Sequence, residues 1–183
     1  MGPRVRADVE LIVLPYSAAN GHSLLHRLIV ELGSGNWQRF WCAVAFGKQT
    51  GNYPDLLEAL DKFVKAGSEA SITFGADLFS GHTRGTDYAA VETLLTALQA
   101  SPNFTLHLYH ESGRTFHPKV YLFDNTKAAK ALAIIGSSNW SDGGLVNNVE
   151  ANTLVHLDLA DKSHREFHKA LSDTFRGYWK EAQ

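Results

Sequence analysis

The sequence has 183 residues, of which 44% are hydrophobic and 20% charged, and its formal net charge is −2. This composition is typical of a folded globular protein, and the charge excludes a global basic field that would attract nucleic acid. The length predicts a single domain over residues 1–183. Cys42 is the sole cysteine, so no intramolecular disulfide can form, and we expect a buried thiol. The N-terminal apolar run is too short for a signal peptide or membrane span, which favours a cytoplasmic location.

Predicted strands and helices alternate along the chain. In chain order we expect a strand over 9–14, a helix over 22–32, a strand over 40–46, a helix over 54–66, a strand over 71–74, a loop over 78–85, a helix over 86–100, strands over 104–110, 119–123, 131–135 and 150–157, and a final helix. Strands interleaved with helices predict an α/β domain with a mixed β-sheet flanked by helices.

The predicted helices also carry expectations about their faces. The helix over 86–100 should bury one stripe formed by Tyr88, Val91, Leu95 and Leu98. The last helix should open with a capping box between Ser163 and Glu166. Two histidine pairs have the i, i+4 spacing that zinc ligands use, namely His22 with His26 and His164 with His168. Neither pair has a His-Glu-x-x-His context, so we expect solvated helix faces rather than a metal site.

The most informative segment lies near the middle of the chain. His117-Pro118-Lys119 precedes Asp124, and Gly136-Ser137-Ser138-Asn139 follows. The run over 116–123 alternates like a strand, so His117 and Lys119 should point to the same face. An imidazole can attack phosphorus or donate a proton, and a lysine supplies positive charge for phosphate oxygens. Small residues over 136–139 let backbone N–H groups, a hydroxyl and a carboxamide approach an anion closely.

This ordered set, His-x-Lys-x4-Asp followed by Gly-Ser-x-Asn, resembles the signature of the phospholipase D superfamily. Glu150 lies eleven residues after Asn139, where nuclease members place an acidic residue. The stretch over 117–150 is similar to the nuclease domains of metal-independent restriction endonucleases of this superfamily. The upstream run over 72–77, which ends in Gly75-Ala76-Asp77, also fits that branch.

The resemblance implies a phospholipase D-like fold and a phosphodiesterase that needs no metal or other cofactor. His117 would attack phosphorus to form a phosphohistidine, and a second imidazole would protonate the leaving oxygen. Lys119, Ser137 and Asn139 would stabilise the non-bridging oxygens, and Glu150 would orient an imidazole. Asp124 is expected to fix the strand end or pair with a base rather than perform chemistry.

A single copy of the motif is present in the sequence. Superfamily members with two motifs pair them across one site, so the resemblance implies a homodimer in which two identical chains face each other about a twofold axis. DNA is favoured over RNA as the substrate, in the manner of a restriction or phage-defence endonuclease. The chain shows no target-recognition domain, so either cleavage is unspecific or a separate DNA-recognition or helicase partner reads the site. No membrane association is expected.

Residues around the motif are candidates for binding the substrate. Arg114 lies three residues before His117 and could contact phosphate, as could the hydroxyl of Ser138. Trp140 either packs beneath the turn or offers a stacking face to a base. Arg39 and Arg84 are further candidates for a local cationic groove.

Two other functions stay open. The same chemistry could act on a phospholipid headgroup, although the chain has no amphipathic basic helix for a membrane surface. Alternatively, the chain could be a dimeric nucleic-acid-binding module without turnover. The complete set of His117, Lys119 and Asn139 favours catalysis over this second alternative.

Overall fold

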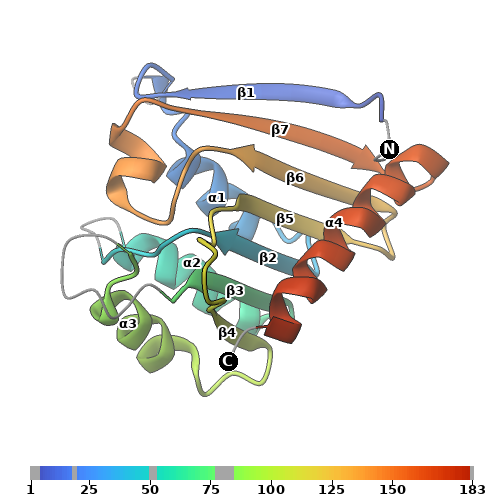
Figure 1. Cartoon of the computed structure of the whole chain (residues 1–183). Helices are drawn as coiled ribbons and strands as arrows, with labels where there is room; N and C mark the ends of the chain where they lie inside the picture. The colour runs from blue at the N-terminus through green and yellow to red at the C-terminus, as the bar shows by residue number, and fades with distance from the viewer. Residues whose placement is uncertain (1–4, 18–19, 50–52, 77–84, 182–183) are drawn as a thin grey trace.

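The centre of the molecule, a computed structural model that describes residues 5–17, 20–49, 53–76 and 85–181, is a seven-stranded sheet (Figure 1). The strands are β1 (Asp8–Leu14), β2 (Arg39–Val44), β3 (Glu69–Gly75), β4 (Phe104–Tyr109), β5 (Lys119–Asn125), β6 (Lys130–Gly136) and β7 (Glu150–Asp158). They lie in the order β1-β7-β6-β5-β2-β3-β4. The pairs β2–β3 and β3–β4 are parallel and the other pairs are antiparallel, which confirms the predicted mixed sheet.

Helices cover both faces of this sheet. The helices of the first face are α1 (Leu24–Gly33), α2 (Tyr53–Lys65) and α3 (Tyr88–Leu98), and α4 (Lys162–Glu181) runs diagonally across the other face (Figure 1). A short π-helix, η2 (Gly143–Asn147), joins β6 to β7 and was not expected from the sequence. Within the described residues, no helix combines the length and the apolar character that crossing a bilayer requires.

Alternation along the strands separates two hydrophobic cores. In β5, Tyr121 and Phe123 are buried beneath α1–α3, whereas Leu122 is buried beneath α4. Trp41 of β2 meets Trp179 of α4 edge-on, with ring centroids 4.8 Å apart. Alternate residues of a strand therefore pack against different helical layers. The core beneath α1–α3 is called the first core, and the buried Cys42 lies in it, as expected.

The stripe predicted for α3 is partly wrong. Tyr88 and Leu95 are 72% and 39% exposed, and Leu94 is buried instead of its neighbour. Adjacent leucines fit a period of 3.6 residues almost equally well, so packing alone chooses between them. The helix also begins after Thr86, whose hydroxyl donates to the carbonyl oxygen of Gly75 rather than joining the helix. The predicted loop over 78–85 lies outside the described residues except for Gly85.

The predicted start of α4 is also corrected. Asp161, not Ser163, caps the helix, because its Oδ1 accepts from the backbone N–H groups of Ser163 and His164. His22 and His26 are exposed, as predicted, but α1 begins at Leu24, so His22 precedes the helix instead of lying on it. His164 and His168 do not lie on a solvated face, since both make hydrogen bonds to other elements.

His168 helps to dock α4 on the sheet through Asp124. The Asp124 carboxylate accepts from Nε2 of His168 at 2.9 Å and from Nε and Nη2 of Arg39 at 2.8 and 2.7 Å. Burial would raise the pKa of Asp124, but the hydrogen bonds from His168 and Arg39 outweigh it and hold that pKa below its ordinary value. Asp124 thus has the structural role that the sequence predicted.

Folding lowers the pKa of Asp124, so its carboxylate stabilises the protein at pH values above the pKa of the unfolded chain. This stabilisation is lost as the pH falls through the pKa of the folded protein. Asp124→Asn should therefore cost about 3 kcal/mol of unfolding free energy at neutral pH, because it leaves Arg39 without its charge partner. Urea unfolding measured from pH 7 to pH 3 should show that the difference in unfolding free energy between variant and wild type becomes smaller as the pH falls. Asp8→Asn, which replaces an exposed aspartate at the start of β1, should unfold like wild type. A gap that stays constant down to pH 3 would contradict this role.

Candidate functional site

The motif residues gather at one edge of the sheet. Four strands contribute ends there, since β5 begins at Lys119, β6 ends at Gly136, β7 begins at Glu150 and β2 ends at Val44. The pairing register places Lys119 opposite Val44 and Gly136 opposite Asn152. Segments that are up to about a hundred residues apart in sequence are therefore brought together by the strand order alone.

His117 and Lys119 lie in direct contact. Nζ of Lys119 is 2.9 Å from Nδ1 and 3.0 Å from Nε2 of the His117 ring, and it donates to the His117 carbonyl oxygen at 3.2 Å. The predicted strand over 116–123 begins only at Lys119, so this contact, rather than strand alternation, holds the two side chains together. In a neutral imidazole one ring nitrogen carries a free lone pair, which can accept from an ammonium or attack phosphorus, whereas the other carries a proton.

Lys119 is held in a restricted position. Its side chain is 7% exposed, whereas His117 lies at the surface. Burial lowers the pKa of the Lys119 ammonium, and the negative charge of Glu150 acts in the opposite direction. A lysine in this setting presents a fixed cation with little freedom to move away from the imidazole.

The turn after β6 is built on close backbone contacts. Ser137 donates its backbone N–H to the carbonyl oxygen of Ala151 at 3.1 Å, and its Oγ accepts from the Ala151 N–H at 3.1 Å. A Cβ at Gly136 would lie 2.3 Å from the same carbonyl oxygen, so only glycine fits there. These bonds fix the position of an exposed hydroxyl beside the first residues of β7.

Asn139 is oriented by the backbone of the segment that follows β2. The N–H of Phe46 points at Asn139 Oδ1 with a separation of 3.4 Å, which directs the NH₂ of the carboxamide away from Phe46. A Cβ at Gly144 would lie 2.4 Å from the Asn139 carbonyl oxygen, so η2 packs tightly against this residue. A donor held in this way requires little reorganisation when an anion arrives.

Glu150 contributes charge rather than a contact with the imidazole in this chain. Its Oε1 accepts from Nδ2 of Asn148 at 3.4 Å, and its negative charge favours the protonated form of Lys119. The expected link from Glu150 to a histidine ring is not among the hydrogen bonds of the described residues, and it stays a prediction.

Residues 54–179, more than half of the chain, match the protein family described as cardiolipin synthase, PLD-like domain. The chain belongs to this phospholipase D-like family. The match confirms the resemblance drawn from the motif, and it includes all five candidate catalytic residues.

Solved structures show the same phospholipase D-like fold. NucT from Helicobacter pylori is 20% identical, with a TM-score of 0.65 over 97% of this chain and 98% of its own. Nuc, a phospholipase D family member from Salmonella typhimurium, is 16% identical, with a TM-score of 0.64 and 97% coverage of both chains. The phosphatidylserine synthase of Haemophilus influenzae is 12% identical, with a TM-score of 0.65 over 96% of this chain but 39% of the synthase. Among curated proteins, no sequence matches significantly.

Two residues proposed to bind substrate belong instead to the support of this phospholipase D-like site. Trp140 is fully buried and packs in the first core, so it offers no face to a base. Ser138 is also fully buried, and its Oγ accepts from Nδ2 of Asn152 at 2.8 Å. The hydroxyl of Tyr121 donates to the Ser138 carbonyl oxygen. Of the two alternatives for Trp140, the structure shows packing beneath the turn, and the buried Ser138 hydroxyl does not reach a phosphate, because both side chains point inward from the turn.

The candidate cations are also separated by the fold. Arg39 is bound to Asp124 at the opposite end of β5, so it does not belong to the site. Arg114 is highly exposed and pairs with Glu111 at 3.1 Å, near enough in sequence to His117 to stay a candidate phosphate contact. Arg84 and Asp77 lie outside the described residues.

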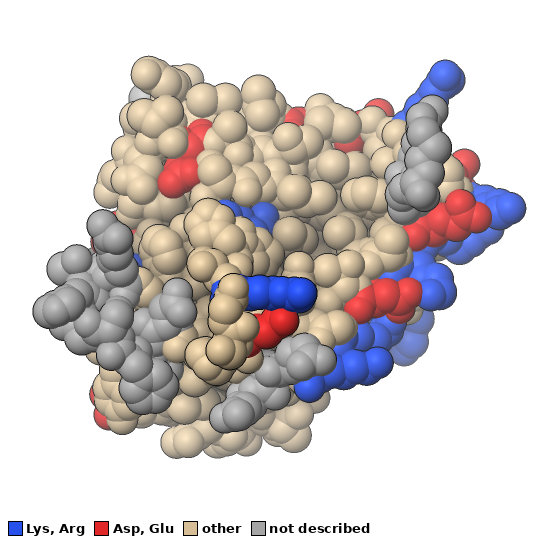
Figure 2. Space-filling view, in the orientation of Figure 1, with Lys and Arg blue, Asp and Glu red and all other residues tan. Residues whose placement is uncertain are grey.

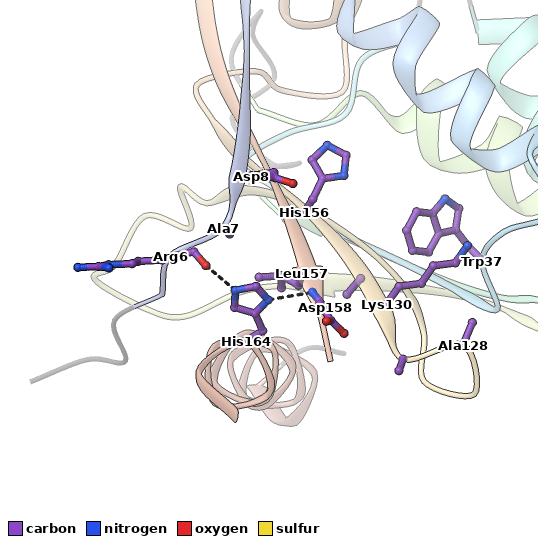
Figure 3. A pocket seen from close by; sticks show the side chains of 12 residues that line it. Arg6, Ala7, Asp8, Trp37, Ala128, Lys130, His156, Leu157, Asp158 and His164 are labelled. Atoms are coloured by element: carbon purple, nitrogen blue, oxygen red, sulfur yellow. Dashed lines mark hydrogen bonds between the residues drawn. The ribbon is translucent and has the colours of Figure 1, made fainter. Parts of the chain in front are cut away.

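No group of three or more His, Cys, Asp or Glu side chains in the described ranges is placed to hold a metal ion. A separate hollow lies at the far ends of β6 and β7, where Trp37 and Lys130 flank one side (Figure 3). There His164 accepts from the Asp158 N–H through Nδ1 and donates through Nε2 to the carbonyl oxygen of Arg6, as the dashed lines of Figure 3 show. None of the motif residues lines this hollow.

Sequence reasoning missed the residues that hold the site in shape. Asn152 binds Ser138, Gly144 packs against Asn139, and the Phe46 N–H approaches the Asn139 carboxamide. Only the Gly143-Gly144 pair gave a local signal, because adjacent glycines often mark close approach of backbones.

Proposed function

We propose that the chain is a metal-independent phosphodiesterase that cleaves DNA through a covalent phosphohistidine. The observation that carries this proposal is the contact between the His117 ring and the partly buried Lys119 ammonium, beside Ser137 and Asn139. A nucleophile, a fixed cation and neutral donors at one sheet edge are the groups that a phosphoryl transfer needs.

The proposed reaction takes two displacement steps at one phosphorus atom. A neutral His117 attacks phosphorus, forms the P–N bond and expels the leaving oxygen, which takes a proton from the His117 of a second copy. That second imidazole then removes a proton from water, which attacks the phosphohistidine and releases the first His117. Lys119 and Asn139 stabilise the non-bridging oxygens, and Ser137 adds a hydroxyl donor.

The active site is proposed to form between two copies of the chain. The motif of one chain supplies one imidazole, whereas the two steps require a nucleophile and a separate acid. A twofold axis beside His117 would bring the second imidazole and a second Lys119 to the same phosphate. Glu150 is proposed to stabilise the imidazolium that develops as the proton moves.

DNA is the proposed substrate because the motif region resembles the nuclease domains of restriction endonucleases. A role in restriction or phage defence, in the cytoplasm and with a separate recognition or helicase partner, is the corresponding biological proposal. A lipid phosphodiesterase is the second candidate, because the matching family is described as cardiolipin synthase and one similar structure is a phosphatidylserine synthase.

A cleavage assay in EDTA tests the proposal. Purified wild type should cut plasmid and single-stranded DNA equally well with and without the chelator, because the chemistry uses no metal. RNA and phosphatidylglycerol vesicles, supplied in parallel, distinguish the other substrates. Loss of DNA cleavage in EDTA and its recovery with Mg²⁺ would contradict the mechanism. Headgroup release from the vesicles without DNA cleavage would move the assignment to the lipid candidate.

A further inference from the structure

The segment that follows β2 runs beside the turn of the motif. Gly47 forms a parallel β-bridge with Trp140, the residue after Asn139. The backbone N–H of Lys48 then donates to the carbonyl oxygen of Trp140 at 2.8 Å. Backbones that are bonded in this way lie about 5 Å apart. Lys48 is therefore a cation directly beside the proposed site, although the sequence motif does not contain it.

The start of α3 is bonded to the other side of the same segment. The Gly47 N–H donates to the hydroxyl of Thr86 at 3.2 Å, and the Asp87 N–H donates to the Gly47 carbonyl oxygen at 2.9 Å. The Asp87 carboxylate binds Nζ of Lys48 at 2.8 Å. Because Gly47 bonds to one side and Lys48 to the other, the segment lies between the motif turn and Tyr88, the first residue of α3.

Asp87 is the N-cap residue of α3, but its carboxylate accepts no hydrogen bond from the helix. An aspartate at this position ordinarily accepts from the first N–H groups of a helix and stabilises it. Here the carboxylate instead holds the ammonium of Lys48, whose side chain is 21% exposed. A cation that is fixed beside the motif turn in place of a helix cap indicates a role in binding an anion rather than in folding.

Tyr88 presents its ring to solvent beside this cation. Its side chain is 72% exposed, although the hydrophobic pattern of α3 placed it on the buried stripe. An exposed aromatic ring offers a flat face on which an unpaired base can stack. Lys48 and Tyr88 thus supply, on two adjoining segments, the two kinds of contact that a nucleotide makes.

Positive charge is otherwise placed away from the motif on much of the surface. On the face shown in Figure 2, Lys and Arg side chains gather along α4, with few over the rest of that face. On α4, Lys169 and Arg176 both pair with Asp173. The net charge of −2 gives no general attraction for a phosphate backbone, so binding depends on cations at the site itself.

We infer that Lys48 and Tyr88 bind one nucleotide next to the scissile phosphate, with Lys48 at its phosphate and the Tyr88 ring stacked on its base. The base must be unpaired to reach the ring, so this subsite takes single-stranded nucleic acid. An ammonium has three N–H donors, so contact with Asp87 is compatible with contact with a phosphate oxygen. The inference rests on the proposed function, because it takes the phosphate beside His117 as the one that is cleaved.

Binding of a fluorescent single-stranded oligonucleotide tests the base contact. Anisotropy is measured in the His117→Ala background, so that the strand stays intact. Adding Tyr88→Ala should raise the dissociation constant about 10-fold, whereas Tyr88→Phe should change it little, because the ring remains. A duplex of the same sequence should bind both equally well, because its bases are paired. Leu95→Ala, a change at another exposed residue of α3, is the control and should bind like its parent.

The salt dependence of binding tests the phosphate contact. With Lys48→Met, the slope of log affinity against log salt should become less steep by about 0.7, the value for one phosphate contact on a single strand. Lys65→Met is the matched control, because Lys65 also pairs with an aspartate, Asp61 at 2.6 Å, but lies at the end of α2. Its slope should equal that of the parent.

Circular dichroism should show that all variants are folded. Unchanged single-strand binding by folded Tyr88→Ala, or an unchanged salt slope for folded Lys48→Met, would overturn the inference. An equal loss of affinity for the duplex would also overturn it. So would weaker binding of Tyr88→Ala to phosphatidylglycerol vesicles with unchanged binding to the oligonucleotide, which would point to a lipid surface.

The proposed function can fail separately from this inference. If wild type cleaves no phosphodiester but both Lys48→Met and Tyr88→Ala weaken single-strand binding as expected, the subsite is supported and the catalytic proposal is wrong. If wild type cleaves single-stranded DNA and Tyr88→Ala does so with an unchanged KM, the catalytic proposal survives and the subsite is wrong.

Discussion

Replacing His117 with alanine is expected to reduce kcat/KM for DNA cleavage at least about 10⁴-fold, because the substitution removes the nucleophile from one chain and the general acid from the other. The ring lies at the surface against Nζ of Lys119, so the change should not disturb the buried core. The residual rate would come from binding and charge stabilisation by the remaining groups.

Initial rates on a plasmid substrate, measured with wild type and variant at equal concentration, check this expectation. His26→Ala provides the matched control, because His26 is also exposed but lies on α1, away from the motif. It should cleave at the wild-type rate. A His117→Ala variant that keeps more than a tenth of the wild-type activity would show that the imidazole is not the nucleophile.

Replacing Lys119 with methionine is expected to lower kcat about 10²–10³-fold, the usual loss when one donor to a developing oxyanion is removed. Methionine keeps much of the length and the apolar stem but carries no charge. Lys119 is a buried residue whose Nζ is held against His117, so methionine removes the positive charge beside the imidazole. Lys119→Arg should restore little of the activity, since a planar guanidinium does not fit the site of a compact ammonium.

Single-turnover rates separate this effect from weaker binding of DNA. Lys130→Met is the control, because Lys130 begins β6 at the other end of the sheet, where it bonds to Asn36. Its rate should equal that of wild type. If Lys119→Met changed only KM and left the single-turnover rate intact, Lys119 would bind substrate without stabilising the transition state.

The sequence predicted the strands and helices well because their hydrophobic periods are strong. β5 illustrates this, since Tyr121, Leu122 and Phe123 alternate between the two cores. The sequence could not show which of Leu94 and Leu95 on α3 is buried, because the two leucines differ only in the neighbours that tertiary packing gives them. Nor could local rules find that His168 reaches Asp124, because that bond depends on where α4 crosses the sheet.

The motif supplied the candidate residues of the site, but the sheet register decides which of them lie together. Lys119 and Arg39 are both cations on neighbouring strands, yet antiparallel pairing of β2 with β5 places them at opposite ends. Likewise, Ser138 and Trp140, which flank Asn139, are candidate ligand contacts by sequence, but both are fully buried and face the interior. Long-range strand pairing and side-chain direction in a turn are properties that spacing alone does not contain.

The most direct test of paired imidazoles is a mixing experiment. Wild type and His117→Ala chains are combined at constant total concentration, allowed to exchange subunits, and assayed on DNA. If one phosphorus needs His117 from both copies, mixed dimers are inactive and activity falls as the square of the wild-type fraction, to about one quarter at equal amounts. Activity that falls only in proportion to the wild-type fraction, to about one half, would show that each chain cleaves alone and would contradict the shared site.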